Sequence, residues 1–192
     1  MNTQPVFLAL ALLAAAFHAL PALAQAPAKL VGAQSEVSFV TKQMGVPVDG
    51  RFKKFDAQIS LDPKKPESGS VAFSIDTGSA TLGVPESDAE MPKANWFNVA
   101  KFPQATFKST AIKGLGNGKF EVVGKLDIKG NARDVVVPVQ ITQSAGNSTA
   151  TGSFVIKRLD FKIGEGEWAD TTVVANDVTV KFKLALTGLG AL

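Results

Sequence analysis

The sequence contains no cysteine, no tyrosine and a single histidine, His18, in 192 residues. His18 lies in the apolar run from Val6 to Leu20, which is followed by Ala22-Leu23-Ala24. An apolar segment that ends in small residues predicts a secretory signal peptide, and we expect cleavage after Ala24. Residues 25–192 then lack the side chains of a Ser-His-Asp triad, a cysteine nucleophile and a zinc site built from histidine or cysteine, so we expect no metal or other cofactor.

Charged side chains are missing from residues 1–24, so the amino group of Met1 is the only positive charge before the apolar run. An uncleaved membrane anchor is therefore the alternative to a signal peptide. The small-residue site and the Gln25-Ala26-Pro27 segment after it favour cleavage and export. Without cysteine the exported chain forms no disulfide bonds, so its stability has to come from an apolar core or from a sheet closed on itself.

The chain also lacks a large excess of either charge, since 20 Lys and Arg against 17 Asp and Glu give a formal net charge of only +3. The three arginines, Arg51, Arg133 and Arg158, are far apart, and the lysines are scattered among acids. Nucleic-acid-binding surfaces usually gather basic residues on one face with aromatic residues between them, so we expect no nucleic-acid partner. With 45% hydrophobic and 19% charged residues, the chain has the composition of a globular domain.

Long helical periodicity is absent, and alternation of apolar and polar residues with a period of two takes its place, as in β-strands. Turn residues separate most of the alternating segments, and the later ones follow one another at hairpin spacing. The region Glu86–Asn98, interrupted by Pro92, predicts a crossover with a short helix. The eight alternating segments are 37–41, 51–61, 70–76, 104–113, 119–129, 135–141, 149–156 and 177–187. The prediction is an all-β domain, a single antiparallel eight-stranded barrel with a short helical crossover, and a two-sheet sandwich is the alternative.

The apolar side of these strands is rich in phenylalanine and small residues, and we expect it to face inward. A membrane barrel would turn this side to lipid and flank it with aromatic girdles. Such girdles cannot be built here, because tyrosine is absent and the only tryptophans are Trp96 and Trp168. Large rings beside alanine and glycine either pack as a solid core or line an elongated apolar slot, and the pattern leaves both readings open.

Four blocks of the sequence resemble, in order, the YceI-like polyisoprenoid-binding family. Val48–Phe55 is similar to its v-x-G-x-F-x-x-F strand, and Trp96–Phe107 to its F-F-x-x-x-x-Y-P-x-x-T-F block. Val123–Gly130 is similar to its G-x-L-t-i-x-G hairpin, and Arg158–Phe161 to its R-x-D-F step. Each block alone is weak, but their order and spacing hold from about residue 30 to residue 186.

The resemblance implies a secreted or periplasmic lipocalin-like barrel that holds a long isoprenoid chain, the tail of a quinone or of a polyprenyl phosphate. Burial of such a chain is worth about 0.8 kcal/mol per methylene-sized unit, so it binds without strong polar contacts. We therefore expect a non-enzymatic carrier in the periplasm that makes transient contact with the membrane surface. The expected lining is Phe39, Phe73, Phe107, Phe120, Val122, Leu126, Phe154 and Phe182, with Trp96 and Phe97 near the entrance.

Two other hypotheses are kept. A carboxylate-dependent enzyme acting on an isoprenoid lipid would use Asp160, Glu165 or Asp170, although the inward-facing sides of the strands carry no acid. A packed β-domain that acts as a stress-related interaction module predicts a filled interior and no ligand.

Two further residue assignments and one expectation about oligomeric state accompany these hypotheses. Lys93 and Lys101 flank the aromatic block and are candidates for a lipid head group, although we expect them to be solvated. Arg158 and Asp160 suit a structural ion pair or a strand bend. An exposed mouth or edge strand is compatible with a homodimer, but nothing in the residues requires one.

Overall fold

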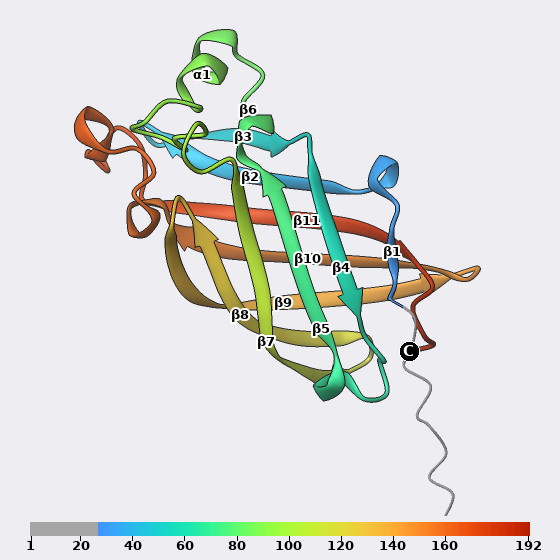
Figure 1. Cartoon of the computed structure of the whole chain (residues 1–192). Coiled ribbons are helices and arrows are strands. Elements are labelled where there is room, and N and C mark those ends of the chain that lie inside the picture. The colour runs from blue at the N-terminus through green and yellow to red at the C-terminus, as the bar shows by residue number, and fades with distance from the viewer. Residues whose placement is uncertain (1–26) are drawn as a thin grey trace, which may run out of the picture.

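The computed structural model describes residues 27–192, which form antiparallel β-strands with one short helix, α1 (Pro85–Glu90) (Figure 1). The expected signal peptide, residues 1–24, lies outside the described residues. No helix within residues 27–192 has both the length and the apolar character needed to cross a membrane.

All the strands belong to one sheet. Its hydrogen-bonded order is β4-β5-β7-β8-β9-β10-β11-β2-β3-β6, and β1 adds to β11 beyond the end of β2. The strands are β1 (Lys29–Leu30), β2 (Glu36–Gln43), β3 (Val46–Phe52), β4 (Phe55–Ser60), β5 (Ser70–Asp76), β6 (Ala80–Thr81), β7 (Gln104–Gly116), β8 (Lys119–Ile128), β9 (Asn131–Ser144), β10 (Asn147–Lys157) and β11 (Asp177–Thr187).

Two-residue turns join β2 to β3, β7 to β8, β8 to β9 and β9 to β10. Both residues of each turn have positive φ, for example Asn117 at 52° and Gly118 at 72°. This is the type I′ geometry, whose twist matches that of the paired strands, and glycine in the second position adopts it without strain. The X-Gly pairs in the sequence therefore specify these hairpins and their register.

The sheet coils into a barrel, and its edges, β4 on one side and β3 with β6 on the other, come together at the corner between β3 and β4 (Figure 1). The line between these two edges is called the seam here. Near the chain terminus Ala28 N donates to Ile59 O at 2.7 Å, which links the segment before β1 to β4. At the corner between β3 and β4, Lys53 N donates to Ser79 O at 3.2 Å. Apart from these two links, no ladder of strand hydrogen bonds joins the two edges within residues 27–192.

The two ends of the barrel differ. At the crossover end, the connection 82–103, which contains α1, and the connection 158–176 fold over the strands (Figure 1). The connection 158–176 contains two short 3-10 segments, η4 (Arg158–Phe161) and η5 (Gly166–Ala169). At the C-terminal end the last residues fold back, because Gln143 Nε2 donates to Gly190 O at 2.7 Å and Leu189 packs against the core.

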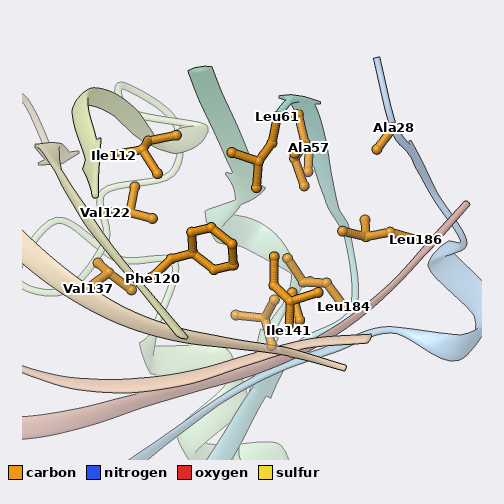
Figure 2. Close-up of a cluster of buried hydrophobic side chains, with 13 residues drawn as sticks. Ala28, Ala57, Leu61, Ile112, Phe120, Val122, Val137, Ile141, Leu184 and Leu186 are labelled. Carbon is orange, nitrogen blue, oxygen red and sulfur yellow. The ribbon is translucent and has the colours of Figure 1, made fainter. Parts of the chain in front are cut away.

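Buried side chains gather in one cluster at each end. In the C-terminal cluster, Phe120, Ile141 and Leu184 point toward one another from β8, β9 and β11 (Figure 2). The crossover cluster contains Met91 and Phe161, which come from the two connections and pack on strand residues. The connections therefore contribute to the core as well as covering it.

The structure confirms the all-β antiparallel class and the helical crossover, but it has eleven strands where eight were expected. The expected strand 51–61 is in fact the end of β3, a corner at Lys53-Lys54 and β4, while β1 and β6 have two residues each. Alternation missed the first part of β3, residues 46–50, because the inward side of this strand includes Gly50, over which the Phe39 ring lies. A glycine at that position interrupts the apolar alternation that identifies a strand.

Candidate functional site

An apolar cavity of about 340 Å³ runs inside the barrel and is lined by residues of both core clusters. This volume falls in the range of about 300–1,000 Å³ that is common for small-molecule sites. Most of the lining is aliphatic or aromatic, and its polar members are Thr41, Gln43, Ser87, Glu90 and Arg158. The interior is therefore partly hollow, whereas the hypothesis of a packed interaction module predicts a filled one.

All ten residues expected to line the interior lie around this cavity. Eight come from strands and two from the crossover between β6 and β7, as the sequence pattern indicated. They are Phe39 on β2, Phe73 on β5, Phe107 on β7, Phe120, Val122 and Leu126 on β8, Phe154 on β10, Phe182 on β11, and Trp96 and Phe97 in the crossover. Their contact with a ligand stays a prediction.

Sequence reasoning missed the lining residues that lie outside regular alternation. Met91, Ile163 and Val174 come from the two connections at the crossover end, and Leu189 comes from the C-terminal segment. The only signal for them in the sequence is a single apolar residue among turn-forming neighbours. Such a residue does not reveal which way its side chain points until the fold is known.

Phenylalanine rings in the cavity wall lie over glycines of neighbouring strands. Phe39 is opposite Gly50 and Phe182 is opposite Gly152, and a Cβ atom at either glycine would overlap the ring. The ring occupies the place of the missing side chain, so it lies along the sheet instead of crossing the lumen. This packing explains how a chain rich in phenylalanine keeps an open interior.

Arg158 is 2% exposed and all five of its N–H donors are used. Every acceptor is a main-chain carbonyl in the stretch 163–175, so this one side chain holds the connection 158–176 in place. Burial lowers the pKa of Arg158 from its ordinary value, because the charged form loses hydration. Nε donates to Ala175 O at 3.1 Å, Nη1 to Ile163 O and Gly164 O at 2.9 Å each, and Nη2 to Trp168 O and Val174 O at 2.7 Å each.

This arrangement agrees with the prediction that Arg158 has a structural role. It does not agree with the suggested ion pair, because Arg158 binds main-chain carbonyls and not the carboxylate of Asp160. Arg158 begins the 3-10 segment η4, where β10 ends, and the side chain of Asp160 is exposed. The chain therefore bends at this point, as the alternative of a strand bend proposed.

Lys129 is the second buried cation at the crossover end. Its ammonium donates to Ala94 O and Lys162 O at 2.7 Å each and to Glu165 Oε2 at 2.9 Å. These three bonds use all the donors of the ammonium group and tie the β8–β9 turn to both connections. Every N–H donor of Lys129 and Arg158 is therefore bound to an acceptor within the protein.

The acids proposed for catalysis do not line the cavity. Asp160 is exposed and Glu165 is paired with Lys129. Asp170 is exposed, and hydrogen bonds from the Thr172 hydroxyl and backbone N–H hold the pKa of its carboxyl below the ordinary value. In the described part of the chain, Glu90 is the one carboxylate in the lining, and it forms an ion pair with Lys93. The paired acids that the enzyme hypothesis needs are thus absent from the cavity lining formed by residues 27–192.

Two polar atoms at the crossover end are buried without a partner. Within residues 27–192, Thr41 Oγ1 and Trp96 Nε1 are the buried side-chain oxygen and nitrogen atoms that make no hydrogen bond. Both side chains line the cavity, and Thr41 is only 8% exposed. A buried donor left unpaired costs about 1–3 kcal/mol, so these two atoms need an explanation.

Comparison with known sequences identifies relatives of this chain. The model of a family described as the YceI-like domain matches residues 29–186. UPF0312 proteins of Vibrio cholerae and Azotobacter vinelandii are each 35% identical over 107 residues, or 55% of this chain. Those matches cover 57% and 56% of the two relatives, so the chain spans a little over half the length of these curated relatives.

Solved structures with the same fold include BcnA of Burkholderia cenocepacia, which is 44% identical with a TM-score of 0.79. That match covers 82% of this chain and 99% of BcnA. A polyisoprenoid binding domain from Saccharophagus degradans, implicated in plant cell wall breakdown, is 21% identical with a TM-score of 0.67. It aligns over 83% of this chain and 97% of its own length, which shows the common fold.

Proposed function

This chain belongs to the YceI-like domain family, and we propose that it is a binding protein for a polyisoprenoid lipid whose chain lies inside the barrel. The observation that carries the proposal is the apolar cavity, which is lined from the crossover cluster to the C-terminal cluster. Each methylene-sized unit that leaves water for such a lining contributes about 0.8 kcal/mol, so a long chain binds tightly without an ion pair.

Two further observations support a polyisoprenoid over other apolar chains. The Saccharophagus degradans domain with this fold is itself a polyisoprenoid binding domain. The cavity wall also combines flat rings, such as Phe182, with branched aliphatic side chains, such as Val122 and Leu126. Isoprene units are flat and carry regularly spaced methyl branches, which such a wall accommodates better than a uniform aliphatic one.

We propose that the protein acts as a carrier in the periplasm, exported by the signal peptide expected at residues 1–24. A carrier needs no reacting groups, and the cavity offers one carboxylate among the described residues, Glu90, which is already paired. The protein then shields the lipid chain from water between the membrane and its destination.

We further propose that the rim of the barrel touches the membrane during loading. Met44 in the β2–β3 turn is 79% exposed, and Val46 at the start of β3 is 63% exposed. Met44 N donates to Val173 O at 2.8 Å, so the exposed Val173 joins them in one apolar patch, here called the rim patch. Residues next to the patch in sequence, Gln43 and Val174, line the cavity. A lipid that crosses the rim patch reaches the cavity without entering water.

Glutamate at both Met44 and Val46 is expected to slow the transfer of a prenyl quinone from vesicles by about tenfold or more, because two apolar contacts with the membrane are lost. Binding of the same quinone in detergent solution should not change. The matched control is glutamate at Val136 and Val155, which are exposed on β9 and β10. Equal slowing in the control, or no slowing in the rim variant, would show that this surface does not load the protein.

The test of the proposed function is mass spectrometry of an organic extract of the protein purified from its own cells, with added lipid as a second step. We expect a prenyl lipid in near-stoichiometric amount. After delipidation, we expect uptake of added quinone or polyprenol. An empty extract together with no uptake of either lipid would reject the proposal and favour the interaction module.

A further inference from the structure

We infer that Leu189 forms the end wall of the cavity and sets the longest prenyl chain that the protein encloses. This role rests on the proposed function, because it concerns the lipid chain inside the barrel. Leu189 lies in the segment after β11, at the end of the barrel opposite α1 (Figure 1). Its side chain lines the cavity and packs against the C-terminal cluster.

One side chain on β9, that of Gln143, holds this segment in place. Its Nε2 donates to Gly190 O at 2.7 Å, and its Oε1 accepts a hydrogen bond from Leu192 N at 3.0 Å. The amide is itself fixed by β10, because Nε2 also donates to Ser148 Oγ at 3.1 Å and Ser148 is buried. The main chain on the far side of Leu189 from β11 is therefore tied to the sheet.

The segment crosses the end of the barrel. Gly188, with a φ of 79°, turns the chain back after β11, and glycine adopts this conformation without strain. The bonds to Gln143 then bring the segment to β9, and the Leu192 side chain lies beside Gly118 in the β7–β8 turn. Since β10 lies between β11 and β9, these contacts carry the segment across three strands. Leu189, between the turn and the Gln143 bonds, is thereby placed against the lumen.

Leu189 differs from Leu186, a lining residue close to it in sequence. Leu186 on β11 is paired with Leu30 on β1 and with Ser148 on β10, so its position is fixed by ladders on both sides. Leu189 lies outside every ladder formed by residues 27–192. A change of its side chain therefore alters the depth of the cavity without disturbing a strand.

The entrance and this wall lie at opposite ends of the cavity. The rim patch includes Val173 of the connection 158–176, so it belongs to the crossover end, and a chain that enters there extends toward Leu189. Each isoprene unit that is enclosed tightens binding, because its apolar surface leaves water. Once the chain reaches Leu189, a further unit has to stay in water. Affinity should therefore rise with chain length up to a limit and then level off.

Binding of polyprenols that differ only in the number of isoprene units tests this role. Leu189→Ala removes three carbon atoms from the end wall, so the first unit beyond the wild-type limit should now tighten binding. We expect a gain of about tenfold or more, the effect of burying about three methylene-sized groups. Leu189→Phe fills the end of the cavity and should weaken the longest enclosed chain by a similar factor, with shorter chains unchanged. General damage to the fold cannot shift the limit in both directions.

The matched control is Leu192→Ala, the same change in the same segment at an exposed residue that does not line the cavity. It should keep the wild-type limit, and thermal unfolding shows that each variant is folded. The inference is overturned if neither Leu189 variant moves the limit, if Leu192→Ala moves it as far, or if wild-type affinity rises with chain length without a limit. If wild-type protein binds no polyprenol of any length, the proposed function fails as well, so the two failures are distinguishable.

Discussion

Replacing Ala150 with tryptophan should abolish binding of long prenyl chains, with an affinity loss of about 100-fold or more. Ala150 is buried on β10 in the C-terminal cluster and lines the cavity. Because Ala150 lines the cavity, an indole at this position projects into it, and the ring fills a large part of a cavity of only about 340 Å³. The contacts of every isoprene unit beyond the blockage are then lost, at about 0.8 kcal/mol per methylene-sized unit.

A short prenyl quinone distinguishes blockage from general damage. Because a short chain needs only one end of the cavity, Ala150→Trp should bind it at the crossover end nearly as well as wild-type protein does. Ala105→Trp places the same indole at the crossover end, since Ala105 lies in that cluster, and should abolish binding of long and short quinones alike. Ala132→Trp, at an exposed position on β9, serves as the neutral control. Long-chain binding that survives in Ala150→Trp would place the chain outside the barrel.

Replacing Arg158 with methionine is expected to lower the free energy of unfolding by about 3–5 kcal/mol. The change leaves five carbonyl oxygens of the stretch 163–175 without their donor. Apolar replacement of a buried ion pair can be harmless when both partners are removed, but here the acceptors belong to the main chain and remain. Domains of this size are stable by only about 5–15 kcal/mol, so the loss is a large share of the total.

Urea unfolding measures this loss, and hydrogen exchange locates it. We expect faster exchange in residues 162–176, with the strands protected until global unfolding. Arg158→Lys keeps the charge but has three donors in place of five, so it should recover only part of the stability. Arg133→Met is the control, because Arg133 is exposed and donates to a single carbonyl, that of Ala132. A loss below about 1 kcal/mol in Arg158→Met would mean that water replaces the guanidinium at these carbonyls.

The sequence predicts the parts of this fold that depend on local pattern. Large side chains alternate along β7 to β11, and an X-Gly pair follows β7, β8 and β9, so these strands and their hairpins could be recognised. The first part of β3 could not be recognised from alternation, because Gly50 has no side chain to mark the inward face. The ring that fills its place comes from Phe39 on another strand.

The same distinction holds for the candidate site. Residues on regular strands, such as Phe107 and Leu126, were identified because alternation assigns their side of the sheet. Thr41 lies on the same inward stripe as Phe39, but nothing local shows that its hydroxyl lacks a partner. The role of Arg158 was equally hidden, because its five acceptors are main-chain atoms, which every residue has.

The seam between β4 and β3 sets this barrel apart mechanically from one that is hydrogen-bonded all the way round. In a fully closed barrel, strand number and stagger fix the circumference. Here the edges are joined by the hydrogen bond from Ala28 N to Ile59 O and by the corner at Lys53. The circumference of this barrel is therefore not fixed by a closed hydrogen-bonded ladder. We expect the barrel to widen along the seam before the long ladders of β7 to β11 separate, because few hydrogen bonds have to break there.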